Sequence, residues 1–373
     1  MISKCSFEKM LFLFCFSFLL NINVYSQPGK SWEILPSLKC DAFSFLNAMS
    51  YEKMYNYMYP REMEIWKGRL GKEFSDSVNA ILDTTGGLGF KASYLITYLQ
   101  IENLDDIINY LSDSSGFANK TVYCLKKYND FRMISSVKDL NTILSQRGKL
   151  IYIFRKMQSA GWEDDWKSVS KRLQADISLK EPLFAKYSPG YLCSLVDDFL
   201  KIKIEQNDSS SRVYYLYYAY PNGFKMPFNM MATWSIENPK YFCSVYMHER
   251  LHTFSIYKDG MEKYHDNLVL NSKSFSKHRE IMTKQLYESD EEFYILAAEA
   301  YLSEKAGLRT KQEAIDYLKT ADGGTAIYSL LIYNYLDKYF DSSKMSYGSF
   351  LKNIFFEKIK AEDLENFIVK NSK

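Results

Sequence analysis

A histidine pair four residues apart constrains this chain more than any other feature. His248 and His252 enclose Glu249 in the pattern His-Glu-x-x-His. On an α-helix, positions i and i+4 share a face, so both imidazoles can reach one tetrahedral metal ion. Glu249 then lies about 100° around the helix axis, beside the open coordination position, where a carboxylate can take a proton from water. The pattern predicts a helix and, on it, a metal site.

The neighbouring residues supply the signals of such a helix. Asn238 is a good N-cap, and Pro239 suits the first helical position, where no N–H is needed. Residues 241–257 contain neither proline nor glycine, and Gly260 can close the end. We therefore expect the pattern to lie within one continuous helix.

Coincidence is the alternative interpretation, in which an exposed helix carries two unrelated histidines. The whole chain has only four histidines, which makes a chance match to this spacing rare. His265 and His278 have no motif around them, and we interpret them as surface or packing residues.

A third ligand is required, because a catalytic zinc site has three protein ligands and one open position. No third histidine follows at the spacing His-Glu-x-x-His-x-x-Gly-x-x-His, so we expect a carboxylate from a later helix over residues 288–304. Glu291, Glu292 and Glu299 compete for this role, with Glu292 favoured. The alternative for Glu292 is a capping box, since Ser289-x-x-Glu292 has that pattern.

The strand signals lie just before the motif. The chain is mostly helical in pattern to about residue 203, and a polar cluster at 207–211 interrupts it. Residues 212–220 are apolar on both faces and predict a buried strand, and 224–228 and 232–236 predict returning strands. One of these strands is a candidate edge along which an extended peptide could lie.

These patterns predict a predominantly helical α+β protein with a small antiparallel sheet and the motif helix directly after it. We place a helical N-terminal domain at residues 27–205 and the domain that carries the chemistry at residues 206–373.

The first segment predicts export. Lys4 and Lys9 precede an apolar run, and Val24 and Ser26 are small residues suited to cleavage after Ser26, so residues 1–26 are predicted to be a secretory signal. We expect a secreted or periplasmic protein without a transmembrane segment after signal removal. Four cysteines then remain, as disulfides or as buried thiols: Cys40, Cys124, Cys193 and Cys243.

Composition excludes one class of partner. Lys and Arg number 47 against 45 Asp and Glu, a net charge of +2. We expect no nucleic-acid binding, since there is no basic excess to displace counterions from a phosphate backbone.

The motif with a downstream helical glutamate resembles the gluzincin class of zinc peptidases, and residues 247–302 look like the catalytic domain of the anthrax lethal factor-like peptidases. The shared features are His248-Glu249-x-x-His252, then Leu268-Val269-x-Asn271-Ser272-Lys273-x-Phe275, then Tyr287 shortly before Glu292-Phe293-Tyr294. Two departures are visible: Arg250-Leu251 replaces the family's apolar-glycine pair, and Tyr287 stands two residues closer to the glutamate.

The resemblance implies a zincin-like catalytic domain and a zinc-dependent endopeptidase that hydrolyses peptide bonds in a protein or peptide substrate. It assigns zinc binding to His248, His252 and Glu292, the general base to Glu249, and oxyanion stabilisation to Tyr287. The alternative is a catalytically inactive, metal-binding zincin-like protein that serves as a protein- or glycan-binding module.

Overall fold

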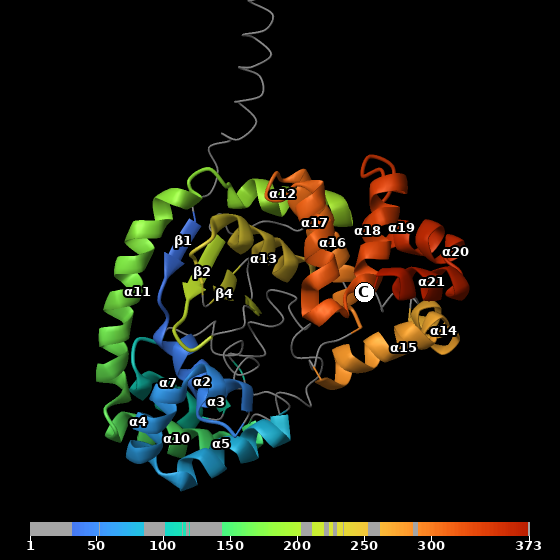
Figure 1. Ribbon diagram of the computed structural model, residues 1–373. Helices are drawn as coiled ribbons and strands as arrows, with labels where there is room; N and C mark the ends of the chain where they lie inside the picture. Colours follow the sequence, from blue (N-terminus) through green and yellow to red (C-terminus); the bar gives the residue numbers. More distant parts are fainter. Residues whose placement is uncertain are drawn as a thin grey trace, which may run out of the picture.

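The computed structural model describes most of the chain after the predicted signal (Figure 1). The described residues are 32–51, 53–85, 101–113, 115–116, 119, 144–202, 211–219, 224–226, 230–233, 235–252, 262–285 and 290–371. The predicted signal at 1–26, Cys124, Tyr287 and Ser289 lie outside them.

One strand and a set of helices form the first part of the chain (Figure 1). Their bounds are β1 Trp32–Leu35, α2 Leu38–Ala48, α3 Lys53–Met58, α4 Pro60–Leu70, α5 Lys72–Thr85, α7 Leu104–Ser112, α10 Arg147–Ser159, α11 Trp162–Phe184 and α12 Pro189–Leu200. Amphipathic spacing explains most of them; in α7, for example, the capping box of Asn103 and Asp106 fixes the start, and one face is buried.

Three further strands complete the sheet: β2 Ser211–Tyr215, β3 Phe224–Met226 and β4 Met230–Thr233. The order is β1-β2-β4-β3. β1 pairs with β2 and β2 with β4 in parallel, and only β3 and β4 are antiparallel. The sheet is therefore mixed, and the prediction of an antiparallel sheet is wrong for the β1–β2 and β2–β4 pairs. β1 comes from a segment whose pattern is mostly helical and pairs with β2 across a long stretch of sequence that leaves no local signal, and β4 rather than β3 lies next to β2.

The remaining chain is helical to its last described residue, which confirms the predominantly helical prediction. The bounds are α13 Pro239–Leu251, α14 Glu262–Asn271, α15 Lys273–Glu280, η3 Ile281–Gln285, α16 Glu292–Lys305, α17 Lys311–Thr320, η4 Ala321–Gly324, α18 Ile327–Tyr339, α19 Tyr347–Phe350, η5 Leu351–Phe355, α20 Phe356–Lys358 and α21 Ala361–Asn371. Among the described residues, none of the helices has both the length and the apolarity that crossing a bilayer requires.

The described residues form two hydrophobic clusters in the interior. One gathers residues between Leu38 and Trp162, together with Tyr218 from the segment after β2. The other holds the motif helix and takes residues from both sides of position 206, including Trp32 of β1. The Trp32 ring lies edge-on to two rings of α13, at 5.1 Å from Phe242 and 4.8 Å from Tyr246. The first strand thus supports the helix that carries the histidines.

A buried carboxylate lies beside the first of these clusters. Asp41 of α2 is fully buried and accepts hydrogen bonds from the Tyr218 backbone N–H, at 2.9 Å, and from the Trp166 indole of α11, at 3.0 Å. Burial raises the pKa of Asp41 to about 6, although these hydrogen bonds oppose the change.

The described cysteines are buried free thiols and not disulfides, and these were the two alternatives left open by the sequence. They are Cys40, Cys193 and Cys243.

Candidate metal centre

The motif helix begins where the sequence predicts. The Asn238 side chain accepts from the backbone N–H groups of Lys240 and Tyr241, and Pro239 takes the first helical position. The end differs, since α13 stops at Leu251 and His252 is its C-cap. The backbone N–H of His252 still bonds to the His248 carbonyl at 3.3 Å, so the two histidines remain one turn apart.

Arg250 explains one departure from the peptidase pattern. Its side chain is 5% exposed and forms a forked ion pair with Asp197 of α12, with Nη2 at 2.7 Å from Oδ1 and 2.8 Å from Oδ2. A buried guanidinium needs such a partner. This pair ties α13 to α12 on the side of the helix away from the imidazoles.

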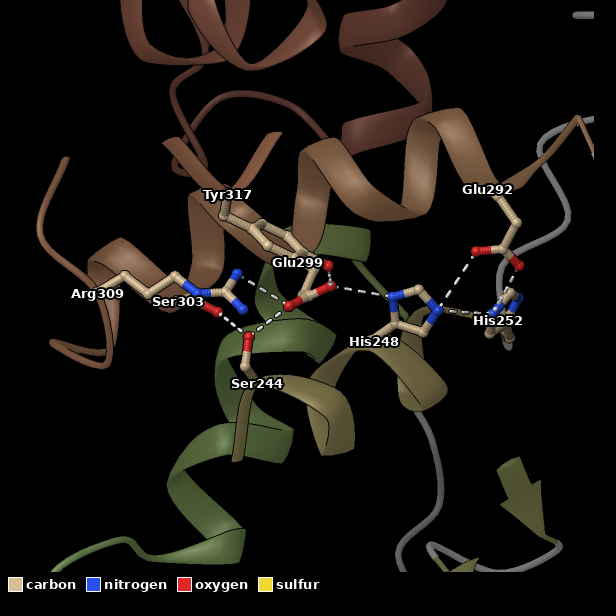
Figure 2. Close-up of polar contacts among 8 residues, drawn as sticks. All are labelled: Ser244, His248, His252, Glu292, Glu299, Ser303, Arg309 and Tyr317. Carbon is tan, nitrogen blue, oxygen red and sulfur yellow. Dashed lines mark hydrogen bonds and ion pairs between the residues drawn. The ribbon is translucent and has the colours of Figure 1, made fainter. Parts of the chain in front are cut away.

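His248, His252 and Glu292 meet at one point (Figure 2). The Nε2 atoms of the two histidines are 3.2 Å apart. Each faces a different oxygen of Glu292, with His248 Nε2 at 3.3 Å from Oε2 and His252 Nε2 at 3.1 Å from Oε1. Two imidazole nitrogens and one carboxylate oxygen are the donor set of a catalytic zinc site, so these residues fit a metal ion.

Glu292 reaches this point from the first position of α16. Glu291 is the N-cap and makes no side-chain capping bond, so Glu292 does not stand three residues inside the helix as a capping box requires. Among the described residues, the group close enough to share a metal contains Glu292 and neither Glu291 nor Glu299. Glu292 is therefore the carboxylate that the geometry brings to the histidine pair.

Glu299 instead lies behind His248 (Figure 2). Its Oε2 is 3.1 Å from His248 Nδ1, the ring nitrogen that faces away from Glu292. A carboxylate in this position fixes the ring orientation and the tautomer of a metal-binding histidine and raises its basicity. The structure does not bring Glu299 to the point shared by His248, His252 and Glu292, because its helix position, seven residues after Glu292, places it on the opposite side of the His248 ring.

Four further side chains surround Glu299, which is 2% exposed. Arg309 donates to Oε1 at 3.0 Å and Tyr317 to Oε2 at 2.9 Å. Ser244 also donates to Oε1 and lies 2.7 Å from the Ser303 hydroxyl. The Arg309 guanidinium stacks on the Tyr317 ring at 3.8 Å, which holds it against the carboxylate.

The charges of this centre are strongly coupled. Burial works against the ionised form of Glu299, but His248, Arg309 and Ser244 outweigh it and lower its pKa to about 2. The pKa of Glu292 is also lowered, since both imidazoles oppose the effect of burial. Burial likewise disfavours a charged His248, yet Glu292 and Glu299 raise its pKa well above 6.5. The two carboxylates thus form a strongly negative environment suited to a cation.

The remaining predicted residues are placed as follows. Glu249 lies on α13 and is partly exposed. Burial opposes a charged His252, but Glu292 outweighs it and raises the pKa of His252 above 6.5, and Glu249 adds a smaller contribution in the same direction. His265 is buried, as a packing residue would be, and Tyr287 lies outside the described residues.

Sequence reasoning missed the residues around Glu299. Ser244 stands four residues before His248 and so shares its helix face, a signal that spacing alone could have given. Arg309 comes from the turn before α17 and Tyr317 from the second half of that helix, and nothing local marks them. Comparisons with family models, with curated proteins and with solved structures found no match to this chain.

Proposed function

We propose that this chain is a secreted zinc-dependent endopeptidase. One observation carries the proposal: both Nε2 atoms of the histidine pair face the Glu292 carboxylate, while Nδ1 of His248 is held by the buried Glu299. The first relationship provides three ligands for a metal, and the second provides the outer contact that such ligands need.

In this proposal, each step of hydrolysis is assigned to particular residues. Zinc, when bound by His248, His252 and Glu292, supplies a water of lowered pKa and polarises the scissile carbonyl. Glu249 accepts the proton of the attacking water and delivers it to the leaving amine. Tyr287 is our candidate for the hydroxyl that donates to the developing oxyanion.

The sheet offers a path for the substrate. β3 pairs with β4 on one side, is antiparallel to it, and lies at the end of the sheet order among the described strands. It also packs against α13. An extended peptide that adds to this edge would pass beside the motif helix, and its main chain would be held by hydrogen bonds that do not depend on sequence.

Metal analysis and a cleavage assay test the proposal together. The purified chain should hold one zinc by elemental analysis and cleave an unfolded protein substrate, a chelator should stop cleavage, and added zinc should restore it. Chelator-insensitive cleavage, or the absence of zinc, would contradict it. Bound zinc without any cleavage would favour the inactive metal-binding module.

Export through cleavage after Ser26 is tested by the N-terminal sequence of the mature protein.

A further inference from the structure

His265 holds the chain on both sides of the third ligand. This histidine of α14 is 1% exposed. Its Nδ1 lies 2.8 Å from the Tyr294 hydroxyl, two residues after Glu292, and its Nε2 lies 3.5 Å from Oδ2 of Asp290, two residues before Glu292. The Nδ1 contact is a hydrogen bond, and the Nε2 contact is a longer, electrostatic one.

Arg279 of α15 completes the contact to Asp290. Its Nε lies 2.9 Å from both carboxylate oxygens, and its Nη2 lies 2.7 Å from Oδ2. Such a fork fixes the direction of a carboxylate more tightly than one hydrogen bond does. Asp290 is only 13% exposed, which reduces competition from water.

Aromatic packing fixes His265 in turn. Its ring lies 5.3 Å from the Phe275 ring of α15 and 6.4 Å from the Phe293 ring of α16, in an edge-on and a tilted arrangement. Neither α14 nor α15 contributes a ligand. The polar contacts of His265 and Arg279 nevertheless reach Asp290 and Tyr294, which bracket Glu292.

We propose that His265, Arg279 and Asp290, here called the Asp290 clamp, are positioning residues that set the Glu292 carboxylate at the distance zinc requires. The inference rests on the metal site of the proposed function. Its physical reason is that Glu292 is the first residue of its helix, where backbone hydrogen bonds hold the chain least, so its direction depends on side-chain contacts. A ligand held loosely costs affinity, because binding must then order it.

The test compares Asp290→Asn with Asp266→Asn. Asp266 is a matched control, since it also faces Arg279, at 3.8 Å, but lies on α14 and is half exposed. We measure the zinc Kd by chelator competition and the melting temperature of the zinc-free protein. Asp290→Asn should weaken zinc binding about tenfold or more, as expected for a contact that orients a ligand, and Asp266→Asn should change it less than about twofold.

The outcomes separate the two proposals. A native chain that binds no zinc overturns the proposed function and the clamp together. A native chain that binds zinc, with an Asp290→Asn Kd within about threefold of native, overturns the clamp alone. A purely structural role would lower the melting temperature and leave the Kd unchanged. If Asp290→Asn does not fold, the same zinc Kd and melting temperature are measured for Arg279→Lys. This change keeps the positive charge but removes the forked hydrogen bonds to Asp290.

Discussion

Oε2 of Glu299 lies 3.1 Å from Nδ1 of His248, on the edge of the imidazole opposite the nitrogen that faces Glu292. The ring is therefore held between two carboxylates from the same helix. One can share a metal with it, and the other fixes its orientation.

Glu299→Gln tests this relationship. The amide keeps the shape but removes the charge that orients His248, so zinc affinity should fall about 10- to 100-fold. The change also leaves the Arg309 guanidinium, whose side chain is only 13% exposed, without its anion, which should reduce the free energy of unfolding by about 3 kcal/mol. Chelator competition and urea denaturation measure the two effects. Glu304→Gln is the control, since Glu304 lies on the same helix and accepts from Tyr333; unchanged zinc affinity in Glu299→Gln would contradict the assignment.

Glu292→Ala should remove one of three ligands and with it tight zinc binding. We expect purified Glu292→Ala to contain little zinc by elemental analysis, while circular dichroism still reports a folded helical protein. Glu291→Ala is the matched control from the preceding position and should retain zinc. A full zinc content in Glu292→Ala would transfer the ligand role to Glu291.

Glu249→Gln should separate metal binding from turnover. The amide cannot accept a proton, so cleavage should fall about 10²- to 10⁴-fold, whereas zinc content should stay near that of the native chain. The assay is hydrolysis of an unfolded protein substrate at equal zinc occupancy. Glu262→Gln, at an exposed position on α14, should cleave normally. Undiminished hydrolysis by Glu249→Gln would exclude it as the general base.

Asp41 predicts a pH dependence of stability. Its pKa is about 6 in the folded chain and 3.8 is its ordinary value, so the folded state binds more protons between these limits. Stability contributed by the protonated group is therefore present at low pH and is lost as the pH rises toward and through 6.

The difference between the folded and the ordinary pKa of Asp41 gives the size of the change in stability. Between about pH 4.5 and about pH 7, the native chain should lose about 2 kcal/mol relative to Asp41→Asn. Urea denaturation of both proteins at the two pH values measures the difference, and the exposed Asp105→Asn should follow the native chain. Equal pH slopes for native and Asp41→Asn would show that Asp41 does not titrate in this way.

The start of the motif helix and the shared face of its two histidines could be predicted because their signals are local. Asn238, Pro239 and the four-residue spacing each act within one or two helical turns. The choice among three nearby glutamates could not be made from spacing alone, since it depends on where α16 begins. Asp290, just before that start, contacts His265 and Arg279, which come from other helices and leave no local signal.

The sheet was predicted less well for a related reason. The strand tendency of residues 212–220 was visible, but the partner of β2 on one side is β1, and parallel pairing across about 180 residues leaves no turn between the strands to read. The contacts of Arg309 and Tyr317 to Glu299 could not be predicted for the same reason, because they form only once α17 has packed beside α16.

The pairing of β1 with β2 also affects how the chain can fold while it is being synthesised. Trp32 emerges from the ribosome about 180 residues before its partner Ser211, whereas the intervening helices can form from contacts close in sequence. A nascent chain of intermediate length therefore carries an unpaired strand with two large apolar side chains, Trp32 and Ile34. Such a chain is a natural client for chaperones and is prone to aggregation until β2 has been synthesised.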